Sequence, residues 1–561
     1  MRRVQPDLLI KNVKVVDVFS LNVVHSNVAI KDGKFLGVGD YYTSAECEVD
    51  AGGVYMAPTL IDGHVHIESS MLSPAELMRE LVSRGVSSIV ADPHEIANVC
   101  GISGVEYILN QSENIPAHVY VMLPSCVPAT EFETSGARLD AKALSALISH
   151  ERVLGLGEMM DFVGVINGKS EPLKKLELAK KYRKAIDGHS PMLSGERLDR
   201  YAAAGVMSDH ECSSVSEFND RISRGMWVQL REGSAAKNLS TLLPAVTLAN
   251  SSRCFFCTDD RHPSDLKSEG SIDYVLKKAI KLGLDPLLGI RMASLNAHLC
   301  YGIERAGAIA CGYRADFFLF DDLHDIRAKS VYIAGELIAQ DGTILTGFGS
   351  KCEPILRMRA RKLDKSDLRL ALNSDEANVI GIIPDELITE HLRLRVKLEQ
   401  GEFKFSDDDI CKAVVLDRHS GKSHVGLGLV KGYGIKRAAV ATSVAHDSHN
   451  IIAIGDNDDD ILAAVNRVVE LGGGMVVASK GRVIDELRLD IAGLMSSASI
   501  DEVASADTRL VRLARSFGVI EGVDPFMTLS FLALPVLPHL KLTDLGLFDV
   551  DKFKHIRVDE G

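Results

Sequence analysis

Two histidines separated by one residue, His64 and His66, are the part of this sequence that points most directly to chemistry. They end a short apolar run that begins at residue 57, and on a β-strand residues i and i+2 face the same side. Both imidazoles would then point into one pocket, where neutral imidazole suits zinc, iron and manganese. Two histidines can also lie on a loop after a strand without binding anything, so the pair alone does not establish a metal site.

Four further polar residues end apolar runs later in the chain: Glu158, His189, His210 and Asp259. Each is weak evidence by itself, because a polar residue at a strand end is common. If each lies on its own strand of one barrel, all four converge with the histidine pair on one axial pocket. Six His and carboxylate ligands suit two divalent ions bridged by a carboxylate. Such a centre polarises a substrate and lowers the pKa of a bound water to about 7.

These residues require strands that alternate with helices over residues 57–299. Helix start signals lie between the apolar runs; for example, Ser73 and Glu76 flank Pro74 in the pattern of a capping box. Eight βα units in roughly 200 to 250 residues are the expected size of a (β/α)8 barrel, a TIM-type α/β fold with its catalytic groups at the strand ends. The eight apolar runs end at His66, His94, Ser125, Glu158, His189, His210, Arg231 and Asp259.

The flanks of the barrel predict further parts. Residues 1–56 are rich in β-branched residues, and residues 300–350 again have the pattern of short strands with glycine turns. We therefore expect the two segments to form one small β domain. Residues 351–369 are basic and unperiodic and indicate a linker or a surface helix. Residues 370–561 predict a separate C-terminal α+β domain, because the whole chain is too long for one ordinary domain.

Composition excludes several classes of protein. The net charge of −14 argues against a nucleic-acid partner, which would require a basic patch and a high pI. No run of 18 or more apolar residues is present, so we expect no membrane span, and the N-terminus lacks the apolar run of a signal peptide. Ten scattered cysteines fit a reduced cytoplasm. We therefore expect a cytoplasmic protein without a nucleic-acid or membrane partner.

The order of these candidate ligands resembles the amidohydrolase superfamily, with Glu158 at the strand-4 position where many members carry a carbamylated lysine. The longer strings are similar to one family within it, the bacterial adenine deaminases. This similarity covers nearly the whole chain. One departure is Pro58-Thr59, where such proteins more often have Pro-Gly, and it touches no expected ligand. The strings are DGHVHIESSML, ADPHEIANVCG, LGEMMDF, DGHSP, AAAGVMSDHE, REGSAAKNL and CTDDRHPSDL.

This resemblance implies hydrolysis of free adenine to hypoxanthine and ammonia, a reaction of purine salvage, at a binuclear centre of Mn, Fe or Zn. By analogy, Asp259 ligates one metal, takes the proton of the attacking water and delivers it to the leaving group. A homodimer or larger homo-oligomer is usual for such barrels. The implied metal ligands are His64, His66, Glu158, His189, His210 and Asp259.

Four more residues near the expected ligands are candidates. His94 and Glu95 follow the second strand and suit substrate contact or an outer metal ligand, and Glu68 suits a similar role. Glu211, next to His210, can protonate a ring nitrogen of the substrate or be a solvated loop acid.

Three candidate substrate-binding residues lie farther along the chain. Arg231 either orients the purine or pairs with its neighbour Glu232. His446 and His449 lie in a polar stretch between two apolar runs. That stretch either reaches the barrel mouth and closes the site or forms a locally hydrogen-bonded turn.

Two other functions compete with adenine deamination. One is hydrolysis of another cyclic amidine or amide on the same barrel, for example opening of a lactam-like ring. The common ring-opening enzymes carry a bridging lysine on strand 4, so Glu158 at that position counts against this function. The extra C-terminal domain also counts against it. The other is a metal-free interaction scaffold, which would be expected to have lost one or more of the ligands.

Overall fold

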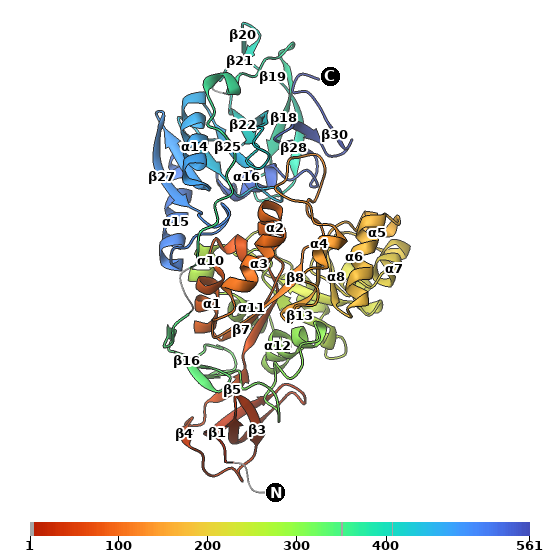
Figure 1. Ribbon diagram of the computed structural model, residues 1–561, viewed down its shortest axis with the longest axis vertical. Coiled ribbons are helices and arrows are strands. Elements are labelled where there is room, and N and C mark those ends of the chain that lie inside the picture. Colours follow the sequence, from red (N-terminus) through yellow and green to blue (C-terminus); the bar gives the residue numbers. More distant parts are fainter. Residues whose placement is uncertain (1–4, 349–351, 407, 561) are drawn as a thin grey trace.

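The computed structural model describes residues 5–348, 352–406 and 408–560. Three parts follow one another along the long axis: an N-terminal β-sheet at one end, a ring of strands and helices in the middle, and a C-terminal part at the other end (Figure 1). The expected boundary between residues 350 and 351 lies outside the described residues. No helix in the described parts of the chain has the length and apolar character needed to cross a bilayer.

The middle part is a closed barrel of parallel strands, as the alternating pattern predicts. β6 to β10 form one parallel sheet and β11 to β13 a second. The two sheets meet where β10 packs against β11 and where β13 packs against β6, with a parallel bridge between Val65 and Asp259. The strands are β6 (Leu60–Val65), β7 (Val86–Ala91), β8 (His118–Leu123), β9 (Val153–Met159), β10 (Ala185–Gly188), β11 (Ser208–Asp209), β12 (Trp227–Arg231) and β13 (Cys254–Cys257).

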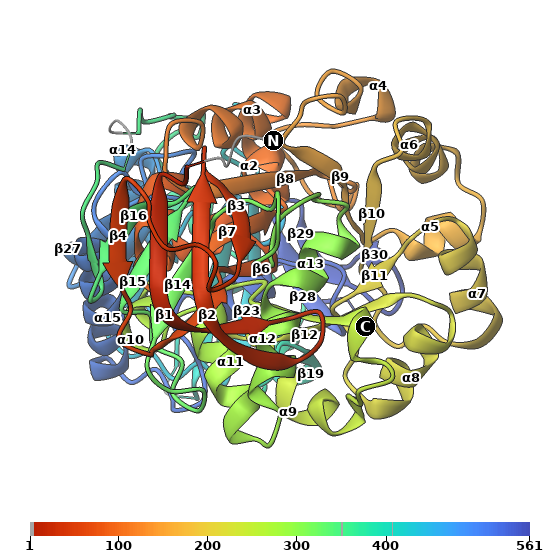
Figure 2. The same cartoon turned by 90° about the horizontal axis from the view of Figure 1, so that it is seen from below.

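Helices cover the outside of the barrel, so strands such as β6, β7 and β12 are buried along their whole length (Figure 2). The capping signal is confirmed at the first of them: Ser73 accepts a hydrogen bond from the Glu76 N–H, and Pro74 opens the helix. The helices are α1 (Pro74–Ser83), α2 (His94–Cys100), α3 (Ile102–Gln111), α4 (Ala141–Leu144), α5 (Phe162–Ile166), α6 (Ser170–Lys181), α7 (Gly195–Ala203), α8 (Val215–Ser223), α9 (Leu239–Leu242), α10 (Pro263–Ser268), α11 (Ile272–Lys281), α12 (Pro286–Ala293) and α13 (Leu295–Cys300).

Strands from both flanks of the barrel form one nine-stranded sheet, because β5 lies between β1 and β14. Asp32 and Gly33 both have positive φ and join β2 to β3 in a tight hairpin, the turn that an Asp-Gly pair favours. The strands are β1 (Leu8–Asp17), β2 (Asn22–Lys31), β3 (Lys34–Val38), β4 (Cys47–Asp50), β5 (Tyr55–Pro58), β14 (Phe317–Phe320), β15 (Ser330–Ile333), β16 (Glu336–Gln340) and β17 (Thr343–Ile344).

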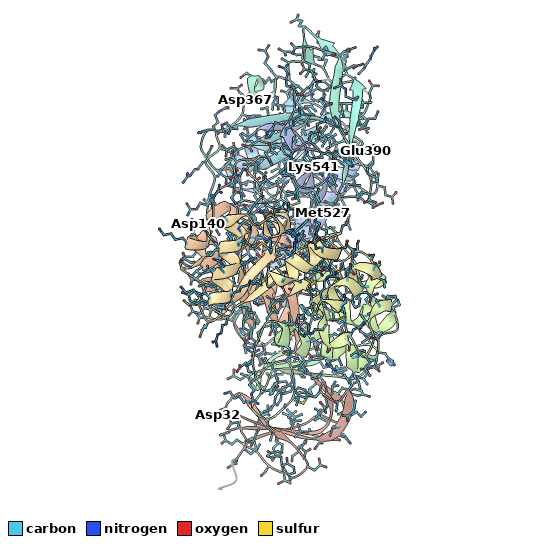
Figure 3. The ribbon with its side chains drawn as sticks, turned by 90° about the vertical axis from the view of Figure 1, so that its right-hand side faces the viewer. Asp32, Asp140, Asp367, Glu390, Met527 and Lys541 are labelled. Atoms are coloured by element: carbon cyan, nitrogen blue, oxygen red, sulfur yellow. The ribbon has the colours of Figure 1, made fainter. Side chains whose placement is uncertain are left out.

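The C-terminal part contains an eight-stranded sheet, on which α14 (Asp458–Leu471) packs against β24, β25 and β26. Its helix α15 (Ile500–Ser516) packs on α10 of the barrel, and Met527 of α16 (Met527–Leu532) lies at the junction (Figure 3). The strands are β18 (Glu376–Ile382), β19 (Thr389–Arg395), β22 (Ile410–Leu416), β23 (Val425–Lys431), β24 (Ala439–Thr442), β25 (Ile451–Gly455), β26 (Gly474–Ser479) and β27 (Arg482–Arg488), with the smaller β20 (Leu398–Glu399), β21 (Glu402–Phe403), β28 (Leu540–Thr543), β29 (Gly546–Asp549) and β30 (Lys554–His555).

The basic segment before this sheet is not a surface helix. Within residues 352–369 the only helical element is a single 3-10 turn, Lys365–Leu368. Asp364 caps this turn, and Arg361 pairs with Asp367.

Candidate metal centre

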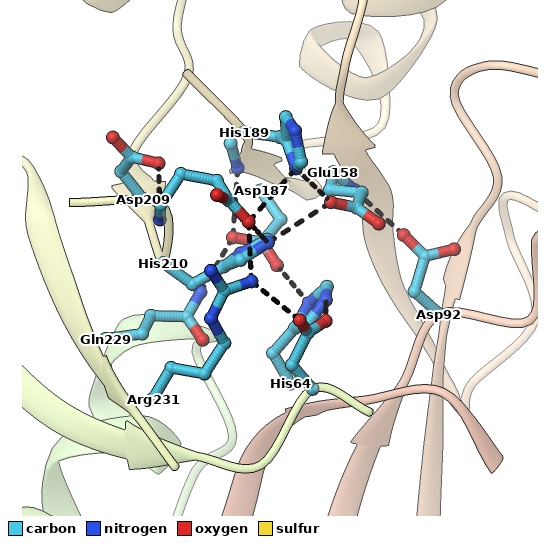
Figure 4. Close-up of polar contacts among 12 residues, drawn as sticks. His64, Asp92, Glu158, Asp187, His189, Asp209, His210, Gln229 and Arg231 are labelled. Atoms are coloured by element: carbon cyan, nitrogen blue, oxygen red, sulfur yellow. Dashed lines mark hydrogen bonds and ion pairs between the residues drawn. The ribbon is translucent and has the colours of Figure 1, made fainter. Parts of the chain in front are cut away.

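The six expected ligands meet at one rim of the barrel. His64 lies in β6 and His66 directly after it, Glu158 lies in β9, and the other three follow β10, β11 and β13. Because the strands are parallel, their carboxyl ends lie at the same rim. Figure 4 shows His64, Glu158, His189 and His210 converging there. All of them are buried except His189, which is partly exposed.

Glu158 lies between two groups of histidines and directs one oxygen to each. Its Oε1 lies 3.4 Å from His66 Nε2. Its Oε2 lies 2.7 Å from His189 Nδ1 and 3.2 Å from His210 Nε2. A carboxylate that offers its two oxygens to separate sets of nitrogen donors has the arrangement of a bridging ligand between two ions.

Closure of the barrel places Asp259 beside the histidine pair. The Asp259 N–H donates to the His64 carbonyl, and the His66 N–H donates to the Asp259 carbonyl, both at 2.9 Å. Asp259 has a left-handed backbone with φ 60°. Its Oδ1 lies 3.0 Å from His66 Nε2 and 3.4 Å from His64 Nε2. These three residues can share one ion.

The histidines around Glu158 keep its carboxylate ionised although it is buried. Burial acts to raise the pKa of Glu158, but the neighbouring His189, His210 and His66 outweigh it and hold that pKa well below its usual range.

Two buried ring nitrogens, His64 Nε2 and His210 Nδ1, have no hydrogen-bond partner among the described residues. A buried polar atom is costly without a partner, and an ion would supply one for His64 Nε2. The donor set therefore fits a divalent metal.

Two aspartates that the sequence analysis did not single out orient the histidine pair. Asp187 Oδ2 lies 2.9 Å from His64 Nδ1, and the Asp92 carbonyl lies 2.8 Å from His66 Nδ1. With both Nδ1 atoms bonded to acceptors, Nε2 of each ring is directed to the pocket. The side chain of Asp92 also accepts the Glu158 N–H at 2.9 Å.

A sequence signal for these supporting aspartates exists. Asp92 and Asp187 each stand two residues before a histidine, in the strings DPH and DGH. Asp187 lies in β10 and Asp92 directly follows β7, so the signal that they share is an acid at the end of an apolar run. Gln229 and Ser208 in turn donate to Asp187, which fixes that carboxylate (Figure 4).

Arg231 does not pair with Glu232. Its Nη1 lies 2.7 Å from Asp259 Oδ2 and 2.5 Å from Glu211 Oε1, whereas Glu232 pairs with Lys278. Burial acts to raise the pKa of Asp259, but the charge of Arg231 and the hydrogen bonds from His64 and His66 together outweigh it and hold that pKa well below its usual range. The sequence-based pairing with Glu232 is wrong because adjacent strand residues point to opposite sides.

Glu211 is not a solvated loop acid. Besides the contact with Arg231, its Oε1 lies 3.4 Å from His210 Nε2 and 3.7 Å from His189 Nδ1. Burial acts to raise its pKa, and the neighbouring cationic groups lower it below the ordinary value. Glu211 therefore belongs to the wall of the metal centre.

The C-terminal loop reaches the barrel. His446 Nδ1 and His449 Nε2 both contact the carboxylate of Glu95, which lies in the first turn of α2. The loop also has a local turn, in which the His449 N–H donates to the Ala445 carbonyl. The loop thus forms a local turn and also reaches the barrel through its contacts with Glu95.

A cavity of about 580 Å³, its open mouth included, lies between the barrel rim and the C-terminal part. Glu68 and Asp260 line it from the barrel, and His446 and Phe531, whose rings are 4.9 Å apart, line it from the other side. Glu68 Oε1 accepts the Ile96 N–H, Oε2 has no partner among the described residues, and burial raises the pKa of Glu68 to about 7.

Comparison with known proteins extends this description. The family model of the amidohydrolase family matches residues 55–348, and that of the adenine deaminase C-terminal domain matches residues 386–554. The chain is 48% identical to adenine deaminase 2 of Carboxydothermus hydrogenoformans over 98% of this chain and 97% of the relative. It is 44% identical to the adenine deaminase of Clostridium acetobutylicum and 46% identical to that of Nitratidesulfovibrio vulgaris, over 98–99% of this chain and 97% of each relative. The chain belongs to the amidohydrolase family and, within it, to the adenine deaminases.

Proposed function

We propose that this chain hydrolyses adenine to hypoxanthine and ammonia at the barrel rim. The observation that carries the proposal is the position of Glu158, whose two oxygens face separate groups of histidines. It is supported by relatives named adenine deaminase that align with nearly the whole chain. A cavity with aromatic and acidic walls lies beside these ligands.

Two divalent ions fit the donor set. His64, His66 and Asp259 would hold one, and His189 and His210 the other, with Glu158 between them. Nitrogen and carboxylate donors without a thiolate suit Mn and Fe as well as Zn. When bound, such ions lower the pKa of a water molecule and polarise the substrate.

Asp259 is the base of this reaction in our proposal. It accepts the proton of the attacking water; the water oxygen adds to C6 of adenine, the exocyclic C–N bond breaks, and the proton goes to the departing amine. Arg231 holds Asp259 Oδ2 at 2.7 Å and keeps the carboxylate ionised. His94, 3.6 Å from Glu158, and Glu211, 3.4 Å from His210, would assist.

The purine ring would occupy the cavity next to these ligands. Phe531 and His446 offer a ring face for stacking. Glu68, with a pKa of about 7 and a free Oε2, can donate or accept a hydrogen bond at a ring nitrogen. His449 supports this wall through its contact with Glu95.

The remaining parts of the proposal concern the protein as a whole. We assign the reaction to purine salvage in the cytoplasm by a homo-oligomer. We divide the chain into a barrel (57–299), a small β domain from both flanks (1–56 and 300–350), a linker (351–369) and a C-terminal domain (370–561). In this arrangement the C-terminal domain covers the substrate.

Ammonia release from adenine, measured together with metal content, tests the proposal. Metal-free protein should be inactive and regain activity with Mn, Fe or Zn, with hypoxanthine as product. Asp259→Asn should abolish turnover, whereas His539→Gln, at an exposed histidine of the C-terminal part, should leave it unchanged. Metal binding without adenine turnover would contradict the substrate, and turnover by Asp259→Asn would contradict the assigned base.

A further inference from the structure

We propose that a third divalent cation binds between the barrel and the C-terminal part, held by His94, Glu95 and Asp447. His94 and Glu95 open α2 of the barrel, and Asp447 lies in the loop between β24 and β25. One donor atom from each of the three residues lies within 4.8 Å of the other two. This site does not depend on the identity of the substrate.

The spacing of the donor atoms suits an ion better than direct bonding. His94 Nε2 lies 3.6 Å from Glu95 Oε1, which is too long for a hydrogen bond. Ligand atoms that each lie about 2.1 Å from one ion are roughly 3 to 4 Å apart. The nitrogen and oxygen donors are those that Mn, Fe and Zn accept.

The two ring nitrogens of His94 face different carboxylates. Its Nδ1 is buried and lies 3.6 Å from both Glu158 Oε1 and Asp92 Oδ1, without a hydrogen-bond partner among the described residues. Its Nε2 faces Glu95 and would be the ligand atom for the ion. His94 would thus contact Glu158 of the metal centre through Nδ1 and bind the third cation through Nε2.

Glu95 has a partner arrangement typical of a metal ligand. Its Oε2 forms a hydrogen bond with His449 Nε2. Its Oε1 is buried, contacts His446 Nδ1 and faces His94 Nε2 across 3.6 Å. Ligating carboxylates are commonly held by such an outer hydrogen bond while the other oxygen binds the ion.

The two carboxylates of this site are buried close together. Glu95 and Asp447 therefore repel each other. Burial raises the pKa of Asp447 to about 6, and the charge of Glu95 adds to the shift. The charges of His94, His446 and His449 hold the pKa of Glu95 well below its usual range. A divalent cation between Glu95 and Asp447 would relieve their repulsion.

Metal stoichiometry tests this site. Metal-free protein is loaded with Mn(II), unbound metal is removed, and the bound metal is counted per folded chain. We expect three ions in the wild type and two in Asp447→Asn. The matched control Asp549→Asn, at another buried aspartate of the C-terminal part, should keep three. His64→Gln should lose metal from the strand ends but retain the ion at Asp447.

Diffraction at the manganese edge supplies a second measurement that needs no variant. An anomalous peak between His94 and Asp447 in the loaded wild type would support the site, even if Asp447→Asn failed to fold. An unchanged count in Asp447→Asn, or no peak at this position, would overturn the proposal, whatever the number of ions at the strand ends. Loss of adenine turnover, with the metal count and the peak retained, would contradict only the deaminase assignment and would leave this site supported.

Discussion

Arg231 Nη1 lies 2.7 Å from Asp259 Oδ2, across the ends of two neighbouring strands, β12 and β13. The same nitrogen contacts Glu211. One buried guanidinium thus orients the acid that we assign as the base and keeps its charge. The contact explains why an arginine ends the seventh strand.

Arg231→Met is expected to lower kcat/KM for adenine by about 10² to 10³, because a positioned acid–base group contributes roughly that much. Removal of the positive charge raises the pKa of Asp259, so its ionised form is lost at a higher pH. The acid limb of the pH–rate profile should therefore move to higher pH. Arg224→Met, at a surface arginine that pairs with Asp199, is the control. An acid limb that stays in place would contradict the assignment.

Asp187→Asn tests the orientation of His64. The amide cannot act as the charged acceptor that holds the His64 Nδ1–H, so Nε2 is no longer fixed toward the pocket. We expect metal affinity to fall by about 10- to 100-fold, with the fold retained. Competition with a chelator measures the affinity, and Asp199→Asn on the surface serves as control. Equal affinities would show that Asp187 has no role in ligand orientation.

Metal uptake should release protons. Burial acts to lower the pKa of His189, but the charges of Glu211 and Glu158 raise it to about 9 in the metal-free protein. At pH 7 to 8 the ring is therefore protonated, and a metal must displace that proton, so affinity should weaken as pH falls below 9. Titration calorimetry in two buffers of different ionisation enthalpy measures the release. Identical heats in both buffers would contradict this protonation state.

Ser73→Ala is expected to change stability and not chemistry. Ser73 Oγ accepts the Glu76 N–H at the start of α1, and loss of such a cap costs about 1 kcal/mol. The free energy of unfolding should fall by that amount while kcat and KM for adenine stay unchanged. Thermal unfolding and steady-state kinetics on the same sample measure both. A large loss of activity at unchanged stability would assign Ser73 another role.

Much of the architecture follows from local sequence. The strand periodicity, the Asp-Gly hairpin at residues 32–33 and the cap at Ser73 depend on near neighbours, and the structure has all three. The spacing of His64 and His66 determines that both rings face one side of β6. The order of polar strand ends determines which residues can meet, because parallel strands bring their carboxyl ends to one rim.

Only the tertiary structure decided which atoms of these residues meet. The contact between Glu95 and His449 joins residues 354 positions apart, and no local pattern encodes it. The choice of Glu211 over Glu232 as the partner of Arg231 depends on the neighbouring strand and on which face each side chain occupies. Strand periodicity specifies a face, whereas a contact also requires the closure of the barrel and the docking of the C-terminal loop, which arise from packing across the whole chain.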